Sequence, residues 1–211
     1  TLTLEEATRH RDAWLAAYAY TAQIYCDFSG YTDMAIGLAL LLGFVFPQNF
    51  RSPYRATGFS DFWRRWHMTL SRFLRDFLYI PLGGNRKGKW NTYRNLMITM
   101  ALGGLWHGAA LNFVAWGMYH GALLTGTHHG RERGWRLPRP LAVAVTFVLV
   151  VLGWVLFRMR TLDGIGSLYA GMLGLHGLGG GVPGHLLAYI AVAAALTWGL
   201  PEEWRWPVER W

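Results

Sequence analysis

The chain has 211 residues, of which 53% are hydrophobic and only 15% are charged, and its formal net charge is +8. Because soluble globular domains carry about 25% charged residues, this composition excludes an ordinary soluble domain and indicates a helical protein that crosses a membrane several times. The single cysteine excludes a disulfide framework and a cysteine-ligated metal site.

The first apolar and aromatic stretch runs from Ala13 to Phe46 and is interrupted by Asp27, Asp33 and the Ser29-Gly30 pair. As one helix it would be about 51 Å long, well beyond the roughly 30 Å of a bilayer's hydrocarbon core. We therefore expect a tilted or kinked helix, or a helix followed by a half-helix. The two aspartates are six positions apart, so they point to different faces, and each is expected to anchor an arginine or a hydroxyl group.

The next segment, Phe62 to Ile80, mixes large apolar residues with arginines. Its aromatic positions fall near one helical face and its arginines largely opposite, which predicts an amphipathic helix at the level of the lipid headgroups. A basic loop, Pro81 to Lys89, follows, and its Gly83-Gly84 pair is a weak candidate for exposing backbone amides to a phosphate. The basic excess of this part of the chain predicts a cytoplasmic surface suited to anionic lipid or to a phosphorylated cosubstrate.

From Asn95 to Gly130 the chain carries no Asp, Glu, Lys or Arg, and basic residues flank both ends of this run. By the positive-inside rule both ends belong to the cytoplasm, so the run must cross the membrane an even number of times. Two spans of about 18 residues that turn near Gly108 form the simplest solution, a hairpin. His107 then lies near the apex, where a titratable ring is either a functional residue or a histidine hydrogen-bonded between packed helices.

A third crossing is predicted for Pro140 to Phe157, an uncharged run of sufficient length. Gly164 to Gly184 is rich in glycine and predicts a loosely helical outer connection. Leu186 to Leu200 predicts a last span, and Glu202 to Trp211 is a polar, tryptophan-rich tail. We treat residues 1–211 as a single transmembrane domain. Because the chain begins at Thr1 without a signal-type segment, we expect it to be the C-terminal part of a longer protein.

The sequence lacks the motifs of zinc proteases, α/β-hydrolases, phosphate-binding loops and paired-cysteine sites. His120, His128 and His129 follow His107 on the second arm of the hairpin, and no metal is expected there. What remains is histidine acid/base chemistry beside a basic entrance for a phosphate-bearing donor. That combination suits acyl transfer, in which an imidazole takes a proton from an acceptor hydroxyl whose oxygen then attacks a thioester.

Four short motifs occur in order: FWRRWH at 62–67, PLGGN at 81–85, LWHG at 105–108 and YHG at 119–121. Together they resemble the membrane-bound O-acyltransferase (MBOAT) family. They are most similar to its bacterial branch, which includes alginate O-acetyltransferases and the D-alanyl transfer proteins of teichoic acid modification. The similarity covers about Gln23 to Leu124, and beyond Arg131 only the hydropathy matches.

The resemblance implies an all-α, multi-pass transmembrane fold in which membrane-spanning, amphipathic and re-entrant helices surround a tunnel. It implies that His107 is the catalytic histidine and that His67 occupies the family's second polar position. Substrate contacts are expected from residues beside these motifs, namely Trp63, Arg64, Arg65, Trp106 and Asn112. Because no serine, threonine or competent cysteine adjoins His107, direct transfer is favoured over a covalent acyl-enzyme.

The implied activity moves an acyl group, most simply acetyl, to hydroxyls of an exported polysaccharide such as alginate, in the bacterial inner membrane. Acetyl-CoA or another acyl thioester would be the cosubstrate, with no tightly bound cofactor. The expected partners are membrane lipids, the polysaccharide acceptor and a periplasmic acetyltransferase that finishes the transfer, and no nucleic acid is expected. D-alanyl or lipid O-acyl transfer, and a non-catalytic scaffold or transporter subunit, remain as alternatives.

Overall fold

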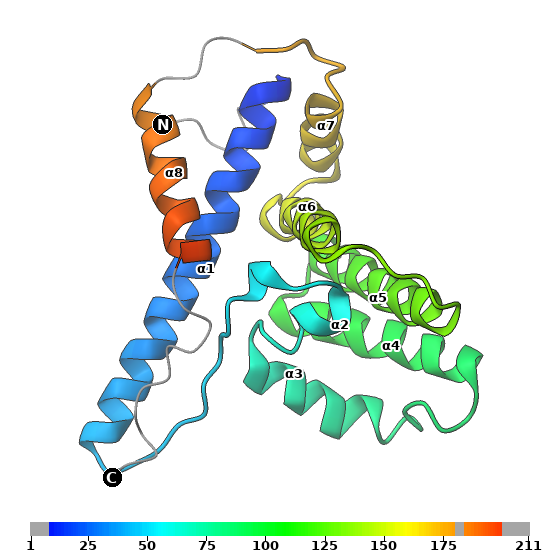
Figure 1. Ribbon diagram of the computed structural model, residues 1–211. Coiled ribbons are helices and arrows are strands. Elements are labelled where there is room, and N and C mark those ends of the chain that lie inside the picture. Colours follow the sequence, from blue (N-terminus) through cyan, green and yellow to red (C-terminus); the bar gives the residue numbers. More distant parts are fainter. Residues whose placement is uncertain (1–8, 180–183, 200–211) are drawn as a thin grey trace.

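The computed structural model describes residues 9–179 and 184–199 (Figure 1). Within these ranges every regular element is helical, in agreement with the predicted all-α class. The elements in chain order are α1 (His10–Leu41), η1 (Pro53–Arg55), α2 (Phe59–Phe62), α3 (Met68–Leu74), η2 (Arg75–Tyr79), α4 (Lys89–His107), α5 (Leu111–Glu132), α6 (Arg139–Arg158), α7 (Leu162–Met172) and α8 (Gly184–Gly199).

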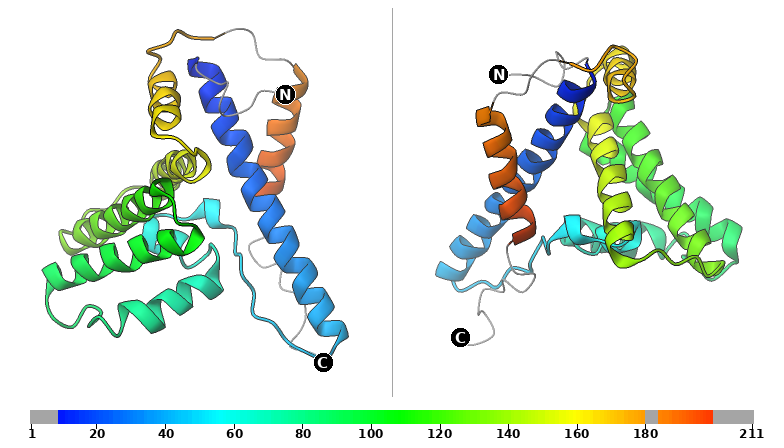
Figure 2. Two further views of the ribbon diagram at one scale, coloured as in Figure 1. Left: turned by 180° about the vertical axis from the view of Figure 1, so that it is seen from behind. Right: turned by 45° about the horizontal axis from the view of Figure 1, so that its top comes forward.

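The helices form two groups that meet along α6 (Figures 1 and 2). In one group the long α1 runs beside α8, and in the other α3, α4, α5 and α6 lie in successive layers. Helices α6 and α7 pack on α1 through a cluster that includes Ala13, Ala17, Val151 and Val155. The alanines have no bulky side chains, so the helix axes approach closely there.

The first helix is continuous through Ser29 and Gly30, so the predicted alternative of a helix followed by a half-helix is wrong, and the tilted single helix stays a prediction. The Thr32 hydroxyl donates to the Ser29 carbonyl oxygen at 2.9 Å, which keeps the polar group inside the helix. A single glycine costs a helix only about 1 kcal/mol relative to alanine. The tertiary contacts of α1 with α6, α7 and α8 offset that cost.

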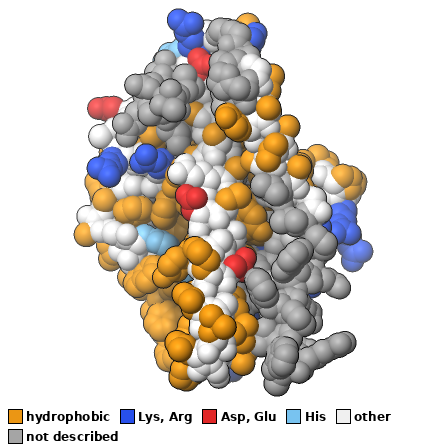
Figure 3. Space-filling model, turned by 90° about the vertical axis from the view of Figure 1, so that its left-hand side faces the viewer, with side chains coloured by type: hydrophobic (Ala, Val, Ile, Leu, Met, Phe, Trp, Pro, Cys, Tyr) orange, Lys and Arg blue, Asp and Glu red, His pale blue; other side chains and the backbone are white. Residues whose placement is uncertain are grey.

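Asp27 and Asp33 both lie on exposed parts of α1. Figure 3 shows acidic side chains isolated among hydrophobic ones on this side of the molecule. Within the described ranges neither aspartate belongs to an ion pair or accepts a side-chain hydrogen bond. The expectation that each anchors an arginine or a hydroxyl is therefore not met by this part of the chain.

The segment predicted as one amphipathic helix from Phe62 to Ile80 is broken instead. α2 ends at Phe62, His67 adopts a left-handed backbone with φ of 44°, and α3 then continues into the π-helical turn η2. Phe62 and Trp66 are buried, at 0% and 4% exposed, whereas Phe73 and Phe77 are 53% and 68% exposed. The aromatic residues therefore do not share one face, because the break at His67 rotates the second half of the segment away from the core.

The helical hairpin predicted across the uncharged run is present, whereas the crossing of a membrane by its two helices remains a prediction. α4 and α5 are antiparallel neighbours joined by the short turn at 108–110. Their backbones touch where glycines face each other: a Cβ atom at Gly104 would overlap the Phe113 carbonyl oxygen, and one at Gly117 would overlap the Met100 carbonyl oxygen. Small residues at a crossing permit this approach, as between helices in membranes.

The two basic flanks of the hairpin lie at the same end of the molecule, as predicted. There the Tyr93 hydroxyl of α4 lies 3.0 Å from His129 Nδ1 and donates to Glu132 Oε2 at 3.2 Å, both on α5. This basic end comprises the exposed residues Arg86, Lys87, Lys89, Arg94, Arg131, Arg133, Arg136 and Arg139. Its cytoplasmic location remains a prediction.

Among the described helices, one, α6, is long and apolar enough to cross a membrane by length and composition. It coincides with the predicted third crossing. The predicted outer connection contains a regular helix, α7, whose N-cap Thr161 accepts a hydrogen bond from the Gly164 amide at 3.2 Å. α8 covers most of the predicted last span, while Leu200 and the predicted tail lie outside the described residues.

Candidate functional site

His107 is the last residue of α4, and the chain turns directly after it at Gly108. Its half-buried ring lies edge to face with Trp116 and Phe157, at centroid distances of 5.3 and 5.2 Å, and 5.1 Å from Trp106. A Cβ atom at Gly108 would lie 2.6 Å from the Phe113 ring. The glycine thus lets the turn close tightly, so that the imidazole is presented at the apex of the hairpin in an aromatic setting.

His67 lies at the break between α2 and α3, and Asn49 holds it there. The Met68 amide donates to the Asn49 backbone carbonyl at 2.9 Å. The Asn49 side-chain Oδ1 lies 3.2 Å from His67 Nδ1 and accepts from the Thr69 amide and hydroxyl at 3.2 and 3.0 Å. The left-handed backbone of His67 is therefore fixed by hydrogen bonds that its ring, Met68 and Thr69 make to Asn49, which offsets its conformational cost.

This hydrogen bond also assigns the tautomer of His67. A carbonyl oxygen can only accept, so the imidazole must carry its proton on Nδ1, and the lone pair is left on Nε2. Burial, and to a lesser degree the nearby His107, lowers the pKa of His67 from 6.5 to about 4. Because the pKa of His67 is lower in the folded protein than in the unfolded chain, protonation of this ring favours unfolding. The stability that goes with the neutral ring is complete above about pH 6.5 and is lost as the pH falls towards 4.

His67 and His107 are connected through packed aromatic side chains. A continuous aromatic wall connects their surroundings. The ring of Trp66, the residue before His67, packs against that of Trp154 with 4.9 Å between centroids. The Trp154 ring packs against Phe157 at 5.7 Å, and Phe157 packs against His107. We call His67, His107 and these three rings the two-histidine site. The two histidines that the sequence motifs singled out therefore border the same aromatic cluster, and their joint role in catalysis remains a prediction.

Replacing Asn49 with leucine is expected to reduce turnover about tenfold, because the tautomer of His67 is no longer fixed by a hydrogen bond worth roughly 1 kcal/mol. It should also lower stability, because the Thr69 donors lose their acceptor. Thr69→Val is the matched control, since it removes one of those donors, together with a 3.5 Å contact of the Thr69 hydroxyl with His67 Nδ1, and leaves the bond between His67 and Asn49 intact. Turnover and the melting temperature of both proteins are the measurements. Equal turnover in the two variants would show that Asn49 serves stability alone.

The five residues predicted to contact substrate occupy different settings. Trp106 is 65% exposed beside His107, whereas Trp63 is buried against Trp116. The Asn112 side-chain amide donates to the Phe157 carbonyl at 3.3 Å, so it ties α5 to α6 behind His107. Substrate contact by these residues remains a prediction.

The two arginines next to His67 also differ. The Arg64 side chain is exposed, while Arg65 Nε donates to Asp61 Oδ1 at 2.8 Å in an ion pair one helical turn away. Arg64 is therefore the better placed of the two to meet an anionic group, because forming a new contact would not cost an existing ion pair.

The PLGGN loop is organised by Asn95, which is fully buried. Its amide group donates to the carbonyls of Leu82 and Gly84 at 3.2 and 3.0 Å, and its Oδ1 accepts from the Arg94 guanidinium. The amides of Gly83 and Gly84 donate to carbonyls of the preceding turn. The expectation that this glycine pair exposes amides to a phosphate is therefore not met.

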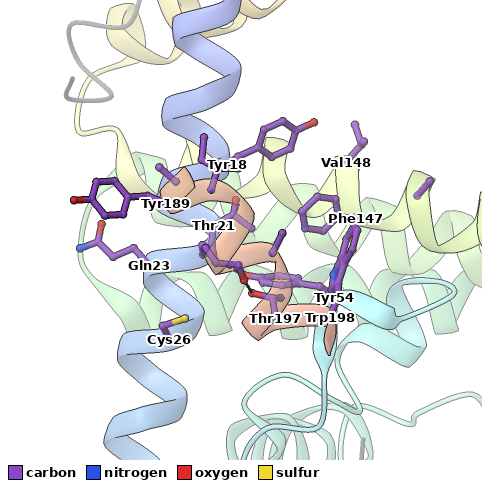
Figure 4. Close-up of a pocket in the computed structure, with 16 residues that line it drawn as sticks. Tyr18, Thr21, Gln23, Cys26, Tyr54, Phe147, Val148, Tyr189, Thr197 and Trp198 are labelled. Carbon is purple, nitrogen blue, oxygen red and sulfur yellow. Dashed lines mark hydrogen bonds between the residues drawn. The ribbon is translucent and has the colours of Figure 1, made fainter. Parts of the chain in front are cut away.

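A separate cavity of about 610 Å³ lies between α1, α6 and α8 (Figure 4). Its lining is almost wholly apolar and includes Tyr18, Tyr54, Phe147 and Trp198, with Gln23 and Cys26 from α1. No histidine or arginine lines it, so it is not the two-histidine site. Within the described ranges, no three His, Cys, Asp or Glu side chains are grouped so that they could hold a metal ion.

Comparison with known proteins gives a consistent result. The model of the family described as MBOAT, membrane-bound O-acyltransferase family, matches residues 11–129, which include both histidines. The chain is 55% identical over 162 residues to the probable alginate O-acetylase AlgI of Pseudomonas fluorescens, covering 76% of this chain and 33% of that protein. It is 46% identical over 170 residues to the peptidoglycan O-acetyltransferase of Helicobacter pylori, covering 79% and 32%.

The name of a more distant relative specifies a different acyl group. The chain is 32% identical over 160 residues to the teichoic acid D-alanyltransferase of Bacillus subtilis, covering 68% of this chain and 40% of that protein. The chain therefore spans only about a third of the length of the curated relatives it matches.

Proposed function

The chain belongs to the membrane-bound O-acyltransferase family, and from this premise we propose that its two-histidine site transfers an acyl group from a thioester to a hydroxyl acceptor. The observation that carries the proposal is that one aromatic cluster borders both His107, at the apex of the hairpin, and His67, whose tautomer is fixed by Asn49. A neutral imidazole has the lone pair that a general base requires.

In the proposed reaction His107 accepts the proton of the acceptor hydroxyl while the hydroxyl oxygen attacks the thioester carbonyl. The carbon–sulfur bond then breaks, and the thiolate leaves with the proton that His107 had taken. The lone pair on His67 Nε2 accepts a hydrogen bond from the acceptor and orients it. The acyl group passes directly between donor and acceptor, so no acyl-enzyme forms.

We further propose that the acyl group is acetyl and that the acceptor is an exported polysaccharide. The names of the relatives at 55% and 46% identity describe acetyl transfer to alginate and peptidoglycan, whereas D-alanyl transfer appears at 32% identity. Acetyl-CoA would approach from the basic end and the acceptor from the opposite side, through a tunnel in a multi-pass protein of the bacterial inner membrane. A periplasmic acetyltransferase would complete the transfer.

The test uses the full-length protein in proteoliposomes, supplied with either acetyl-CoA or a D-alanyl thioester and with alginate or teichoic acid. The proposal predicts new O-acetyl esters on alginate. Transfer of D-alanine to teichoic acid alone would assign the alternative acyltransferase activity. If no ester forms although the protein is correctly inserted and its periplasmic partner is supplied, the result would favour a non-catalytic scaffold or transporter subunit.

Replacing Arg64 with glutamine is expected to raise the KM for the acyl donor about two- to fivefold, with little change in kcat. The reason is that an exposed arginine contributes roughly 0.5–1 kcal/mol to binding an anionic group. Initial rates over a range of donor concentrations measure it. Arg160→Gln, an exposed arginine just beyond the end of α6, is the control. An unchanged KM for the Arg64 variant would make this arginine a lipid anchor.

A further inference from the structure

The YHG motif at 119–121 has no part in the mechanism above, yet each of its residues contacts a different neighbour. The Tyr119 hydroxyl donates to the Leu149 carbonyl of α6 at 2.8 Å. A Cβ atom at Gly121 would lie 2.9 Å from Met97 Sδ of α4, so this glycine permits close helix packing. His120 points between these contacts into the core, where it is fully buried.

His120 lies where α2, α5 and α6 meet. Its ring is 5.4 Å from that of Trp63 and 4.8 Å from that of Trp116. On the α6 side, a Cβ atom at Gly153 would come within 2.9 Å of His120 Nε2, so the imidazole depends on a glycine at this position. His120 therefore contacts both the segment that leads into His67 and the tryptophan that packs against His107.

Several buried polar side-chain atoms at this junction have no hydrogen-bond partner among the residues that the structure describes. Within the described part of the chain, neither ring nitrogen of His120 has a hydrogen-bond partner, and the same holds for Nε1 of Trp63 and Nε1 of Trp116. Buried polar atoms without partners cost free energy, and an apolar ring of similar size would fill the same space without that cost. Four such atoms on three rings in mutual contact point to a small polar molecule between them.

The chemistry of the four atoms identifies the molecule. A neutral imidazole supplies one donor and one acceptor, and the two indoles supply donors only, so acceptors are in deficit. A water molecule can accept one hydrogen bond from each indole and donate one to the imidazole nitrogen that carries the lone pair, which gives the roughly three bonds that buried waters commonly make. The imidazole N–H is the one atom of the four that this water does not satisfy. Because Trp63 is 9%, Trp116 2% and His120 0% exposed, a larger hydroxylated ligand has no access to the site.

We propose that His120 holds an ordered water molecule shared with Trp63 and Trp116, and that it thereby acts as a positioning residue for His107. The water connects Trp63, on the segment that leads into His67, with Trp116, whose ring packs edge-on against that of His107. When the water is lost, the Trp116 ring can shift, and His107 then moves away from the position in which it accepts the proton. The second half of this proposal rests on the proposed function, whereas the water site does not.

The first test is the melting temperature of the full-length His120→Phe protein in lipid nanodiscs. If the water is present, phenylalanine displaces it and leaves two indole donors unpaired, so the melting temperature falls by several degrees. If His120 is merely an unpaired polar group, phenylalanine removes its cost and the melting temperature rises. A rise or no change overturns the proposal, whether or not the protein is an acyltransferase.

The second test separates positioning from stability. The His120→Phe protein, assayed well below its melting temperature, is expected to show kcat lowered about tenfold with an unchanged donor KM. His120→Gln, which can again bond a water, should recover part of both kcat and the melting temperature. A lower melting temperature with normal kcat retains the water site and refutes the positioning role. A wild-type protein without transferase activity would refute the proposed function alone.

Discussion

The His107→Ala protein is expected to lose acyl transfer almost completely, by a factor of about 10² to 10⁴, which is the usual contribution of a general base. It should still reach the membrane in normal amounts. The ring is only half-buried, and the glycine contacts that hold the hairpin together do not involve it. The initial rate of ester formation and the amount of protein in the membrane fraction are the two measurements.

Two comparisons make this result interpretable. His67→Asn should retain part of the activity, because an amide can still hydrogen-bond to the acceptor. His176→Ala, an exposed residue after α7 and remote in sequence from the two-histidine site, should behave as wild type. If the His107→Ala protein turned over at close to the wild-type rate, His107 would not be the general base.

The Gly104→Ala protein is expected to be strongly destabilised, by about 3 kcal/mol, because the added methyl group overlaps the Phe113 carbonyl of the facing helix. Backbone atoms cannot move aside as a flexible side chain can, so α4 and α5 must separate. His107 at the end of α4 would then be displaced, and activity should fall together with stability. Thermal unfolding of the full-length protein, followed by tryptophan fluorescence, measures the effect.

Gly126 supplies the matched control for this substitution. It also lies within the hairpin, on α5, but a Cβ atom there meets nothing within 4 Å. Gly126→Ala should therefore be neutral or slightly stabilising, since alanine favours a helix by up to about 1 kcal/mol over glycine. Similar melting temperatures for the two variants would show that the close approach of α4 and α5 does not limit stability.

The sequence predicted the features that depend on charge and length. An uncharged run with basic flanks has few ways to fold, so the hairpin and the shared end of its flanks followed from the sequence. His67 and His107 were both singled out by motifs that resemble a known family, and their catalytic roles remain predictions. The break at His67 was not predicted, because the apolar spacing on both sides of it suits a continuous helix.

The features that the sequence did not reveal depend on contacts between distant residues. Asn49 fixes His67 from 18 positions away, and Asn95 shapes the PLGGN loop from 11 and 13 positions away. Neither asparagine belongs to a motif that signals such a role. Of the forms expected for α1, the division into a helix and a half-helix is absent for a related reason, since packing against other helices outweighs the weak local preference of Ser29 and Gly30.

The most direct test of a histidine-catalysed direct transfer follows the acyl group itself. The full-length protein is mixed with radiolabelled acetyl-CoA, first alone and then with alginate and the periplasmic partner, and label is counted on the full-length protein and on the alginate. The mechanism predicts that the protein remains unlabelled and that label reaches the acceptor only when both substrates and His107 are present. Stable label on the protein without acceptor, or labelled acceptor formed by His107→Ala at the wild-type rate, would contradict it.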